Sequence, residues 1–543
     1  MLKPFFPLFV CLVTSYIIFS ANSTVQTIDP NGVGTDLYFA KAITQGQIPL
    51  RDFNDIYGPL MNYYNALCMR LSGFDLHSLI TGKIFLRTIA SGLFFLAASR
   101  IMPALFALVA SLAFTVFTPD FSHNIKSYGI ICLESGILWA ILSYFISQNK
   151  KYILGAAAFI LLLGLIKINF GAALLGSSFI SFILFDLFKY RKPWAPVFSK
   201  YGLLSVLIIA FMILIYYFHL KGLSLCEVQQ SLPFLNAYAY KEGSLSDGLI
   251  NFIKNSLLGF PTDPFLKAVK FIWWLAIIRL IVRMHAHYSC TARWTSLHRD
   301  FALITTALLL GLLVSNHEFY VGGADYESFY SRPFSVMLIA YFISEAALIS
   351  GKIIETFMLI FFSMGIITNA YGQWKGLDVY KDPAHFFKYK GVNAYVTNDP
   401  RDMQTMMQTA DYINEHLSPQ ETFFAFPNDA VYYFLTGRSS PSRLVFLLHV
   451  ENINEGQQID LINALEKKGN KYVVLDNICY FGRAFDDYGV FGQNNCLLLD
   501  KYIKKYFVEV AGFGNVPGAN VGTKIFKRKA SLFVIIRKPG DLN

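Results

Sequence analysis

Charged residues are scarce in this chain of 543 residues. Asp, Glu, Lys and Arg make up 15% of it, against about 25% in soluble domains. Hydrophobic residues make up 54%, and the mean hydropathy is +0.43. The apolar residues are gathered into runs, many of them long enough to cross the ~30 Å hydrocarbon core of a bilayer. The composition therefore excludes an ordinary soluble protein and indicates an integral membrane protein.

Several motifs of well-known chemistry are also missing. The ten His form no H-x-x-x-H or H-E-x-x-H pattern, and no two of the seven Cys form C-x-x-C, so the sequence does not predict a zinc or redox site. It contains no G-x-x-x-x-G-K-[ST] phosphate loop, which argues against ATP hydrolysis, and no G-x-S-x-G elbow. The net charge is +10, but the basic residues form no patch on a soluble helix, so no nucleic-acid partner is expected.

Hydropathy predicts about eleven membrane spans. Their ranges are 4–21, 81–99, 102–118, 128–147, 152–168, 171–188, 202–218, 270–286, 301–316, 333–349 and 352–371. No clear cleavage site follows the first run, so we expect a retained span rather than a signal peptide. Basic residues recur in alternate loops: Arg100; Lys150 and Lys151; Lys189, Arg191, Lys192 and Lys200; Arg283, Arg293 and Arg299; and Lys352. By the positive-inside rule this pattern predicts a cytoplasmic N-terminus and a C-terminal region on the other side.

Two of the predicted outside segments are long, 21–80 and 221–267, and a third, 316–332, is short and polar. Loops of such length usually have structure or a function of their own. After residue 372 the composition changes, and helices alternate with strands. We expect helices at 403–417, 429–435, 459–468 and 501–506, strands at 422–426, 472–475 and 507–510, and a closing hairpin of 523–526 with 531–536. The chain is therefore predicted to hold a transmembrane domain over 1–372 and an extracytoplasmic α/β domain over 373–543.

The first outside segment carries the most informative motif. Residues 46–59 read G-x-x-P-x-R-D-F-x-x-x-Y-G-P, and the segment is rich in acids, with Asp29, Asp36, Asp52 and Asp55. This motif resembles the first-loop signature of the GT-C superfamily of membrane glycosyltransferases, and in particular the protein O-mannosyltransferases and the lipid A aminoarabinose transferase. The strings at 426–429 and 433–438 are also similar to the terminal domain of that family. The resemblance covers most of the chain and implies a GT-C-like fold.

The resemblance implies a catalytic base among the first-loop acids, near the start of a helix. A carboxylate suits this role because general-base catalysis needs a proton acceptor within reach of the nucleophile. Asp36 and Asp29 both remain candidates, and Asp36 is preferred slightly because it begins a predicted helix at 36–43. The alternative for either residue is an N-cap carboxylate.

A second acid is implied near the fourth predicted span, where Glu134 and Asp120 are the candidates. Glu134 lies within an apolar run, and a carboxylate at membrane depth is costly unless it is paired or faces a wet cavity. We therefore favour a functional role for Glu134. The alternative is a structural role, in which Glu134 is the partner of a lysine or of a backbone amide.

A lipid-phosphate donor needs cations at the outer interface to hold its phosphate. The candidates are Lys167, Arg332, Lys126 and Arg51. The alternative for each is that its side chain only snorkels to the membrane interface and binds no phosphate. The candidate residues of the substrate cleft are Tyr57, Asp52, His317 and Tyr330. A divalent metal on His317 with Glu318, Asp325 or Glu327 is a less favoured possibility, because residues near one another in sequence are weak support for a metal site.

The C-terminal region contains two cysteines, Cys479 and Cys496. In an oxidising compartment they can form a disulfide, and two buried thiols are the alternative.

Together these features predict a glycosyltransferase of the bacterial cytoplasmic membrane. The resemblance implies a polyprenyl-phosphate sugar as donor, an extracytoplasmic lipid, glycan or protein as acceptor, and inversion at the anomeric carbon if the displacement is a single step. No cofactor is expected beyond the lipid-linked donor. The rival is a transporter or a lipid or polysaccharide flippase. Transporters often carry paired repeats and broken spans, and we find neither in this sequence.

Overall fold

The structure is a computed structural model with side chains. It describes residues 5–28, 32–55, 57–118, 125–232, 254–255, 267, 270–271, 273–279, 281, 296–317, 329–350, 352–427, 429–445, 454–476, 491–493, 496–514 and 521–529.

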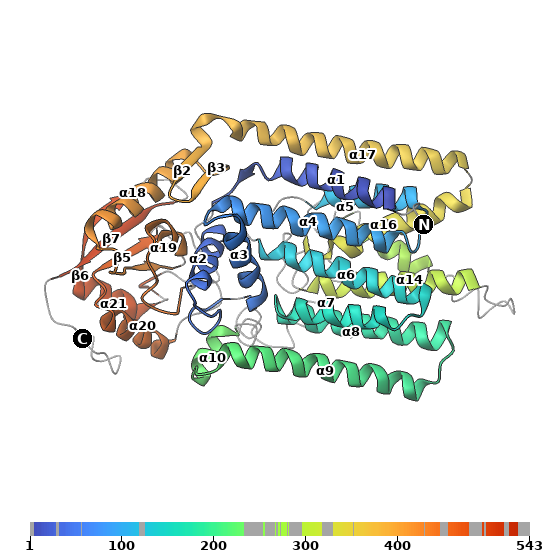
Figure 1. The fold of residues 1–543 in the computed structure, drawn as a ribbon, viewed down its shortest axis with the longest axis horizontal. Coiled ribbons are helices and arrows are strands. Elements are labelled where there is room, and N and C mark those ends of the chain that lie inside the picture. The colour runs from blue at the N-terminus through green and yellow to red at the C-terminus, as the bar shows by residue number, and fades with distance from the viewer. Residues whose placement is uncertain are drawn as a thin grey trace.

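Long apolar helices form a bundle in which they run side by side (Figure 1). The helices are α1 (Phe5–Asn22), α4 (Leu76–Ala98), α5 (Ala104–Phe117), α6 (Lys126–Ser147), α7 (Lys151–Gly164), α8 (Ile168–Leu184), α9 (Trp194–Leu220), α14 (Ser296–Ser315), α16 (Arg332–Ser350) and α17 (Lys352–Asp378). Among the described residues, five helices are long and apolar enough to cross a membrane: α1, α4, α6, the helix over Ile168–Lys189 and α9. Shorter apolar helices cover Ala104–Phe117, Lys151–Gly164 and Asp300–Ser315. This mostly helical architecture fits the predicted membrane protein, and the number of eleven spans stays a prediction.

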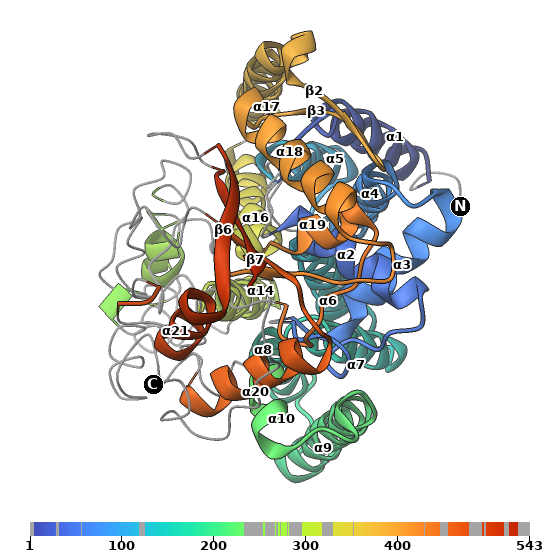
Figure 2. The same cartoon turned by 90° about the vertical axis from the view of Figure 1, so that its left-hand side faces the viewer.

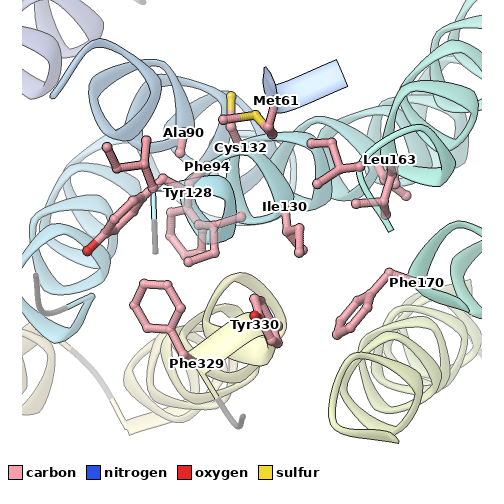
Figure 3. Packing of buried hydrophobic residues seen from close by; sticks show 14 of the residues in the cluster. Met61, Ala90, Phe94, Tyr128, Ile130, Cys132, Leu163, Phe170, Phe329 and Tyr330 are labelled. Atoms are coloured by element: carbon pink, nitrogen blue, oxygen red, sulfur yellow. The ribbon is translucent and has the colours of Figure 1, made fainter. Parts of the chain in front are cut away.

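Burial differs sharply between the helices of the bundle. The apolar window of α6 is 83% buried, whereas that of α9 is 11% buried. A helix that is apolar on all sides belongs in a protein interior or in a membrane. The buried α6 packs inside the bundle, where Tyr128 and Ile130 meet Phe94, Phe329 and Tyr330 (Figure 3). The apolar side chains of α9, such as Leu203 and Phe211, are exposed at the edge of the bundle, where a membrane would cover them.

The first loop forms two helices at one end of the bundle. These are α2 (Val33–Thr44) and α3 (Pro59–Ser72), and a short strand, β1 (Val25–Gln26), precedes them. Gly46 ends the α2 turn with a positive φ of 94°, which glycine adopts without steric cost. Pro59 is the first residue of α3, a position where its missing N–H costs nothing. Helix α3 therefore begins at the last residue of the first-loop motif. The second long segment contributes α10 (Leu225–Ser231) next to this loop.

The C-terminal elements cover the same end of the bundle (Figures 1 and 2). They are β2 (Phe386–Tyr389), β3 (Val392–Val396), α18 (Pro400–His416), β4 (Phe424–Phe426), α19 (Ala430–Thr436), α20 (Glu455–Lys467), β5 (Tyr472–Asp476), α21 (Leu497–Tyr506), β6 (Phe507–Phe513) and β7 (Thr523–Arg528), with one-turn 3₁₀ helices at Val379–Lys381 and Pro383–His385. Four strands form a sheet in the order β4-β5-β7-β6, with β4 parallel to β5. The other three strands form a sheet in the order β1-β3-β2.

Two sequence-based expectations concern these sheets. Strand β7 pairs with β5 on one side and β6 on the other, and residues 531–536, the predicted hairpin partner of 523–526, lie outside the described residues. Strand β1 pairs with β3 in parallel, Val25 opposite Tyr395, so a segment of the first loop belongs to a sheet of the C-terminal region. The two predicted domain ranges are thus joined by backbone hydrogen bonds.

Candidate active site

The start of α6 lies where the first loop meets the bundle, and a buried charge cluster forms there. The Lys126 ammonium nitrogen is 2.5 Å from Oδ2 of Asp55 and 3.4 Å from Oδ1 of Asp36. All three side chains are at most 4% exposed. One lysine therefore bridges two carboxylates away from water, where their interaction is much less screened than at the surface.

Asp55 is held rigidly within this cluster. Its Oδ2 also accepts a hydrogen bond of 2.6 Å from the Asn62 amide, and its Oδ1 accepts one from the backbone N–H of Tyr57. Asp36 is less constrained: its Oδ2 is buried and has no hydrogen-bond partner among the residues that the structure describes. The cluster thus holds one saturated carboxylate and one with a vacant acceptor position.

Burial sets the protonation behaviour of Asp36. Loss of hydration raises the pKa of this carboxyl from its ordinary value to about 6, and Asp55 adds to the rise while the Lys126 ammonium opposes it. Desolvation dominates because it disfavours the charged form. A carboxylate with a pKa of about 6 is ionised at neutral pH and still basic enough to accept a proton, which is the property of a general base.

Tyr57 connects this cluster with a second cation. Its ring lies 5.1 Å from the Lys126 nitrogen and 5.4 Å from the Lys167 nitrogen. Lys167 also lies 5.2 Å from the ring of Phe170 and 5.3 Å from that of Tyr330. Aromatic faces attract cations at these distances. The three rings fix the Lys167 ammonium next to the acidic cluster.

The backbone explains why Tyr57 lies beside Lys167. The N–H of Gly58 donates to the carbonyl of Ile166, and the N–H of Leu60 donates to that of Leu165. These carbonyls belong to the break between α7 and α8. A Cβ on Gly58 would collide with the Leu165 carbonyl and the Tyr216 hydroxyl. Only glycine allows the first loop to approach this break so closely.

Polar groups from the end of α14 and the start of α16 complete the surroundings. Nε2 of His317 is 2.9 Å from the Asn169 amide, and its Nδ1 is 2.6 Å from the Val314 carbonyl. The rings of His317 and Tyr330 both pack on Phe170, and Figure 3 shows Phe170 and Tyr330 facing each other. The Tyr330 hydroxyl is 3.2 Å from that of Ser127, the residue after Lys126. The six predicted residues Asp36, Lys126, Tyr57, Lys167, Tyr330 and His317 therefore share one neighbourhood.

Glu134 lies deeper in the bundle. It is eight residues beyond Lys126 on α6, which at ~1.5 Å per residue is about 12 Å along the helix. Its Oε1 accepts a hydrogen bond of 2.8 Å from Ser315, and its side chain is fully buried. Ser315 on α14 thus partners one oxygen of Glu134, whereas the buried Oε2 has no hydrogen-bond partner among the described residues. The distance along α6 separates this acid from the Asp36 cluster.

Arg51 and Asp52 form an ion pair with each other, with 2.9 Å between Nε and Oδ1, and both are partly exposed. Within the described part of the chain neither makes a contact with Lys126 or Lys167. Arg332 is the first residue of α16 and is 7% exposed, two residues after Tyr330.

Several predicted residues lie outside the described residues: Asp29, Asp120, Glu318, Asp325, Glu327 and Cys479. Nothing in the structure bears on the roles proposed for them. Cys496 is buried, and its pairing with Cys479 stays a prediction.

The sequence reasoning did not select Asp55, Asn62 or Asn169 as site residues. Asp55 was one acid among several in the first loop, and its distance from Lys126 along the chain is 71 residues. A signal was nevertheless present, since Asp55 lies within the first-loop motif two residues before Tyr57, and Asn169 lies two residues after Lys167.

The C-terminal region clamps the loop that carries Asp55. The backbone N–H of Asn54 donates to the carbonyl of Arg443, and the side-chain oxygen of Asn54 accepts from the N–H of Val445, each at 2.8 Å. The Arg443 guanidinium donates to the carbonyl of Leu50 at 2.9 Å. The Tyr38 hydroxyl on α2 accepts from the N–H of Ser440. Residues 440–445 therefore help to position both the loop and the helix that supply the acids.

No protein-family model matches the chain, and no curated protein matches its sequence. Solved structures do match. The chain is similar to the oligosaccharyltransferase AglB of Archaeoglobus fulgidus, solved in complex with an inhibitory peptide and a dolichol-phosphate, with a TM-score of 0.53 and 13% identity over 96% of this chain and 74% of that one. It is also similar to ArnT from Cupriavidus metallidurans bound to undecaprenyl phosphate, with a TM-score of 0.50 and 12% identity over 96% of this chain and 98% of that one.

Sequence identities this low establish a shared fold and nothing more. The structural similarity extends over almost the whole of this chain in both cases. It agrees with the resemblance drawn from the first-loop motif. The chain shares its fold with AglB and ArnT.

Proposed function

We propose that this protein is a membrane glycosyltransferase that moves a sugar from a polyprenyl-phosphate donor to an acceptor on the extracytoplasmic side. The observation that carries the proposal is that an acidic site and a cationic site lie close together. A buried carboxylate with a raised pKa, Asp36, lies beside a cation held in aromatic rings, Lys167, and Tyr57 contacts the lysines of both sites. The similarity of the fold to structures solved with dolichol-phosphate and with undecaprenyl phosphate supports the same class of donor.

In the proposed reaction Asp36 takes the proton from an acceptor hydroxyl or amine. The acceptor atom then attacks the anomeric carbon of the sugar, and the bond from that carbon to the phosphate oxygen breaks. The electron pair leaves with the polyprenyl phosphate, whose growing negative charge Lys167 stabilises, with Arg332 as the second candidate cation. A single displacement of this kind inverts the anomeric configuration.

The roles of the remaining residues follow from their contacts. Lys126 holds Asp36 and Asp55 together, so it is assigned to positioning the base rather than to the donor phosphate. Glu134 and Asp120 remain the candidates for a second acid, and Asp29 remains the alternative base. A divalent metal bound near His317 is the alternative to a metal-free reaction.

We also propose the topology that the loop charges predict, with a cytoplasmic N-terminus, about eleven spans over 1–372 and an extracytoplasmic α/β domain over 373–543. The pairing of β1 with β3 supports one part of it, since it requires residues 25–26 and 392–396 to lie on the same side of the membrane. A bacterial cytoplasmic membrane suits a donor of this class.

The proposal is tested with the purified protein and radiolabelled polyprenyl-phosphate sugars offered with membrane extracts as acceptor. We expect label to pass from the lipid into a new product and polyprenyl phosphate to be released in equal amount. In parallel, proteoliposomes are assayed for uptake of sugars and lipid-linked oligosaccharides. If every donor is inert while the proteoliposomes move solute or lipid, the protein is a transporter or flippase and the proposal fails.

A further inference from the structure

A second buried polar cluster lies at the opposite end of the bundle, at the turn between α8 and α9 (Figure 1). Asp186 is its centre, in a turn of π-helix at Phe185–Lys189. The Asp186 carboxylate accepts hydrogen bonds from the hydroxyls of Tyr144 and Tyr201 and from the Lys192 ammonium, the last at 2.7 Å. The Lys200 nitrogen is 3.5 Å away. Short π-helical turns are rare and often occur at functional sites.

The charges of this cluster do not balance. One lysine would neutralise the buried Asp186, yet Lys192 and Lys200 both reach it. Lys150 adds a further positive charge close enough to act on Lys200. Lys189, on the same turn, is paired with Asp300 at 3.3 Å. Among the described residues this end of α6, α8 and α9 therefore carries a surplus of positive charge.

Lys192 and Lys200 are both held in place and still meet solvent. Lys192 lies 5.2 Å from the ring of Tyr190, and Lys200 lies 4.3 Å from that of Tyr201. Their side chains are 38% and 35% exposed. Cations fixed in advance lose little conformational freedom when they bind an anion, and a buried carboxylate beneath them provides that fixation here.

The surroundings indicate which phase the ligand comes from. Phe188, Trp194 and Phe198, on the same turn and the start of α9, are 58%, 71% and 52% exposed. Exposed aromatic side chains at a helix end are typical of the level of lipid headgroups. Basic pockets between membrane helices at this level bind the headgroups of anionic lipids.

We propose that Lys192 and Lys200, anchored by Asp186, form a binding site for the phosphate headgroup of an anionic membrane lipid. This site lies at the end of the bundle away from the Asp36 cluster, and it does not depend on the proposed glycosyl transfer. Lipid bound there would hold together the ends of α6, α8 and α9.

The test uses the full-length protein in nanodiscs of phosphatidylcholine with or without phosphatidylglycerol. Lipid retained after extraction is counted by native mass spectrometry. The wild type is expected to retain phosphatidylglycerol in preference to phosphatidylcholine. The double variant Lys192→Gln, Lys200→Gln is expected to lose this preference about 25-fold, since each lysine near an anionic headgroup contributes about five-fold.

The matched control is Arg100→Gln with Lys151→Gln. These two cations lie at the same end of the bundle and share the ring of Tyr152, so the control removes the same charge without touching Asp186. It should keep the lipid preference. Equal losses in the two double variants would show general electrostatics and overturn the proposal, as would a wild type that retains both lipids alike.

The double variant leaves a buried carboxylate with fewer partners and can fail to fold. A triple variant with Asp186→Asn added removes that charge as well, and it should fold while lacking the site. Inorganic phosphate is offered in a further arm. If phosphate alone displaces all retained lipid at equal concentration, the site takes free phosphate and the assignment to a lipid is wrong.

Discussion

Asp36 is the residue whose chemistry is most sharply defined, because its pKa of about 6 arises from burial in the folded protein. A base must be ionised to accept a proton. As the pH falls through 6 the carboxyl becomes protonated, so kcat/KM for sugar transfer should fall about ten-fold per pH unit below that value. The measurement is a pH profile of transfer with the purified protein. A profile that is flat between pH 5 and about 7 would assign the base to another residue.

Replacing Asp36 by Asn keeps the shape of the side chain and removes its basicity. We expect a loss of about 10²- to 10⁴-fold in kcat, the range for a general base. The control is Asp378→Asn, an exposed acid that is 61% accessible and paired with Lys381, and it should leave transfer unchanged. If Asp36→Asn is as active as the wild type, Asp29 becomes the stronger candidate.

Lys167 is predicted to hold the donor phosphate, since three aromatic rings fix its ammonium near the cluster. Lys167→Gln should lower kcat/KM for the lipid donor about a hundred-fold, the usual effect of removing one group that stabilises developing charge. Lys167→Arg keeps the cation and should recover part of the rate. The measurement is initial rate against donor concentration. Equal rates for the Gln and Arg variants would show that the charge at this position is unimportant.

Single residues also show why part of the site was predictable and part was not. Polar or charged side chains are costly next to an apolar bundle unless they have a partner or a function. Four predicted residues stand out for this reason: Asp36, Lys126, Tyr57 and Lys167. Their grouping, however, depends on backbone contacts such as Gly58 to Ile166, which join segments far apart in the chain. The saturation of Asp55 by Asn62 and Lys126 follows from that packing and has no local signature.

At the scale of elements, the approach of the first loop to the break between α7 and α8 is the contact that brings Tyr57 to Lys167. Gly58→Ala would force a Cβ against the Leu165 carbonyl. We expect a loss of stability of about 1–3 kcal/mol, as for other overpacked sites, together with slower transfer, because Tyr57 would shift away from Lys167. Thermal unfolding and transfer rates of the same preparation provide the measurement.

The matched control is Gly155→Ala on α7, where an added Cβ meets nothing within 4 Å. Alanine favours a helix over glycine, so this variant should be as stable as the wild type or slightly more stable. If Gly58→Ala behaves like Gly155→Ala, the close approach does not determine the geometry of the site.

Elements with a strong local pattern were predicted well, and elements that depend on distant partners were not. Helix α18 has an amphipathic sequence, and the predicted 403–417 overlaps the observed Pro400–His416. Strand β5 is buried over its whole length and was found from its apolar run. Strand β1 has two residues, and it is a strand because it pairs with β3, which lies far along the chain. No local periodicity encodes such a pairing.

At the scale of the whole molecule, the two polar clusters divide the bundle into unlike ends. The Asp36 cluster is capped by the first loop and the C-terminal region, whereas the Asp186 cluster is rimmed by lysines and exposed aromatics. The proposed transfer of sugar from a membrane donor needs this asymmetry, because the reacting groups must lie at the face where the acceptor arrives. The surplus of lysine at the other end agrees with the proposal that this end faces the cytoplasm.

This asymmetry yields a prediction of orientation that labelling can test. Arg401 and Lys504 are exposed in the C-terminal region, and Lys151 is exposed at the lysine-rich end. In a chain whose native cysteines are replaced, Arg401→Cys and Lys504→Cys should react with an impermeant maleimide added to intact cells, because the proposed topology places both outside. Lys151→Cys should react only after the membrane is opened. The reverse pattern would put the Asp36 cluster in the cytoplasm, where an acceptor of the cell envelope cannot reach it, while labelling of all three in intact cells would indicate that the membrane had been breached.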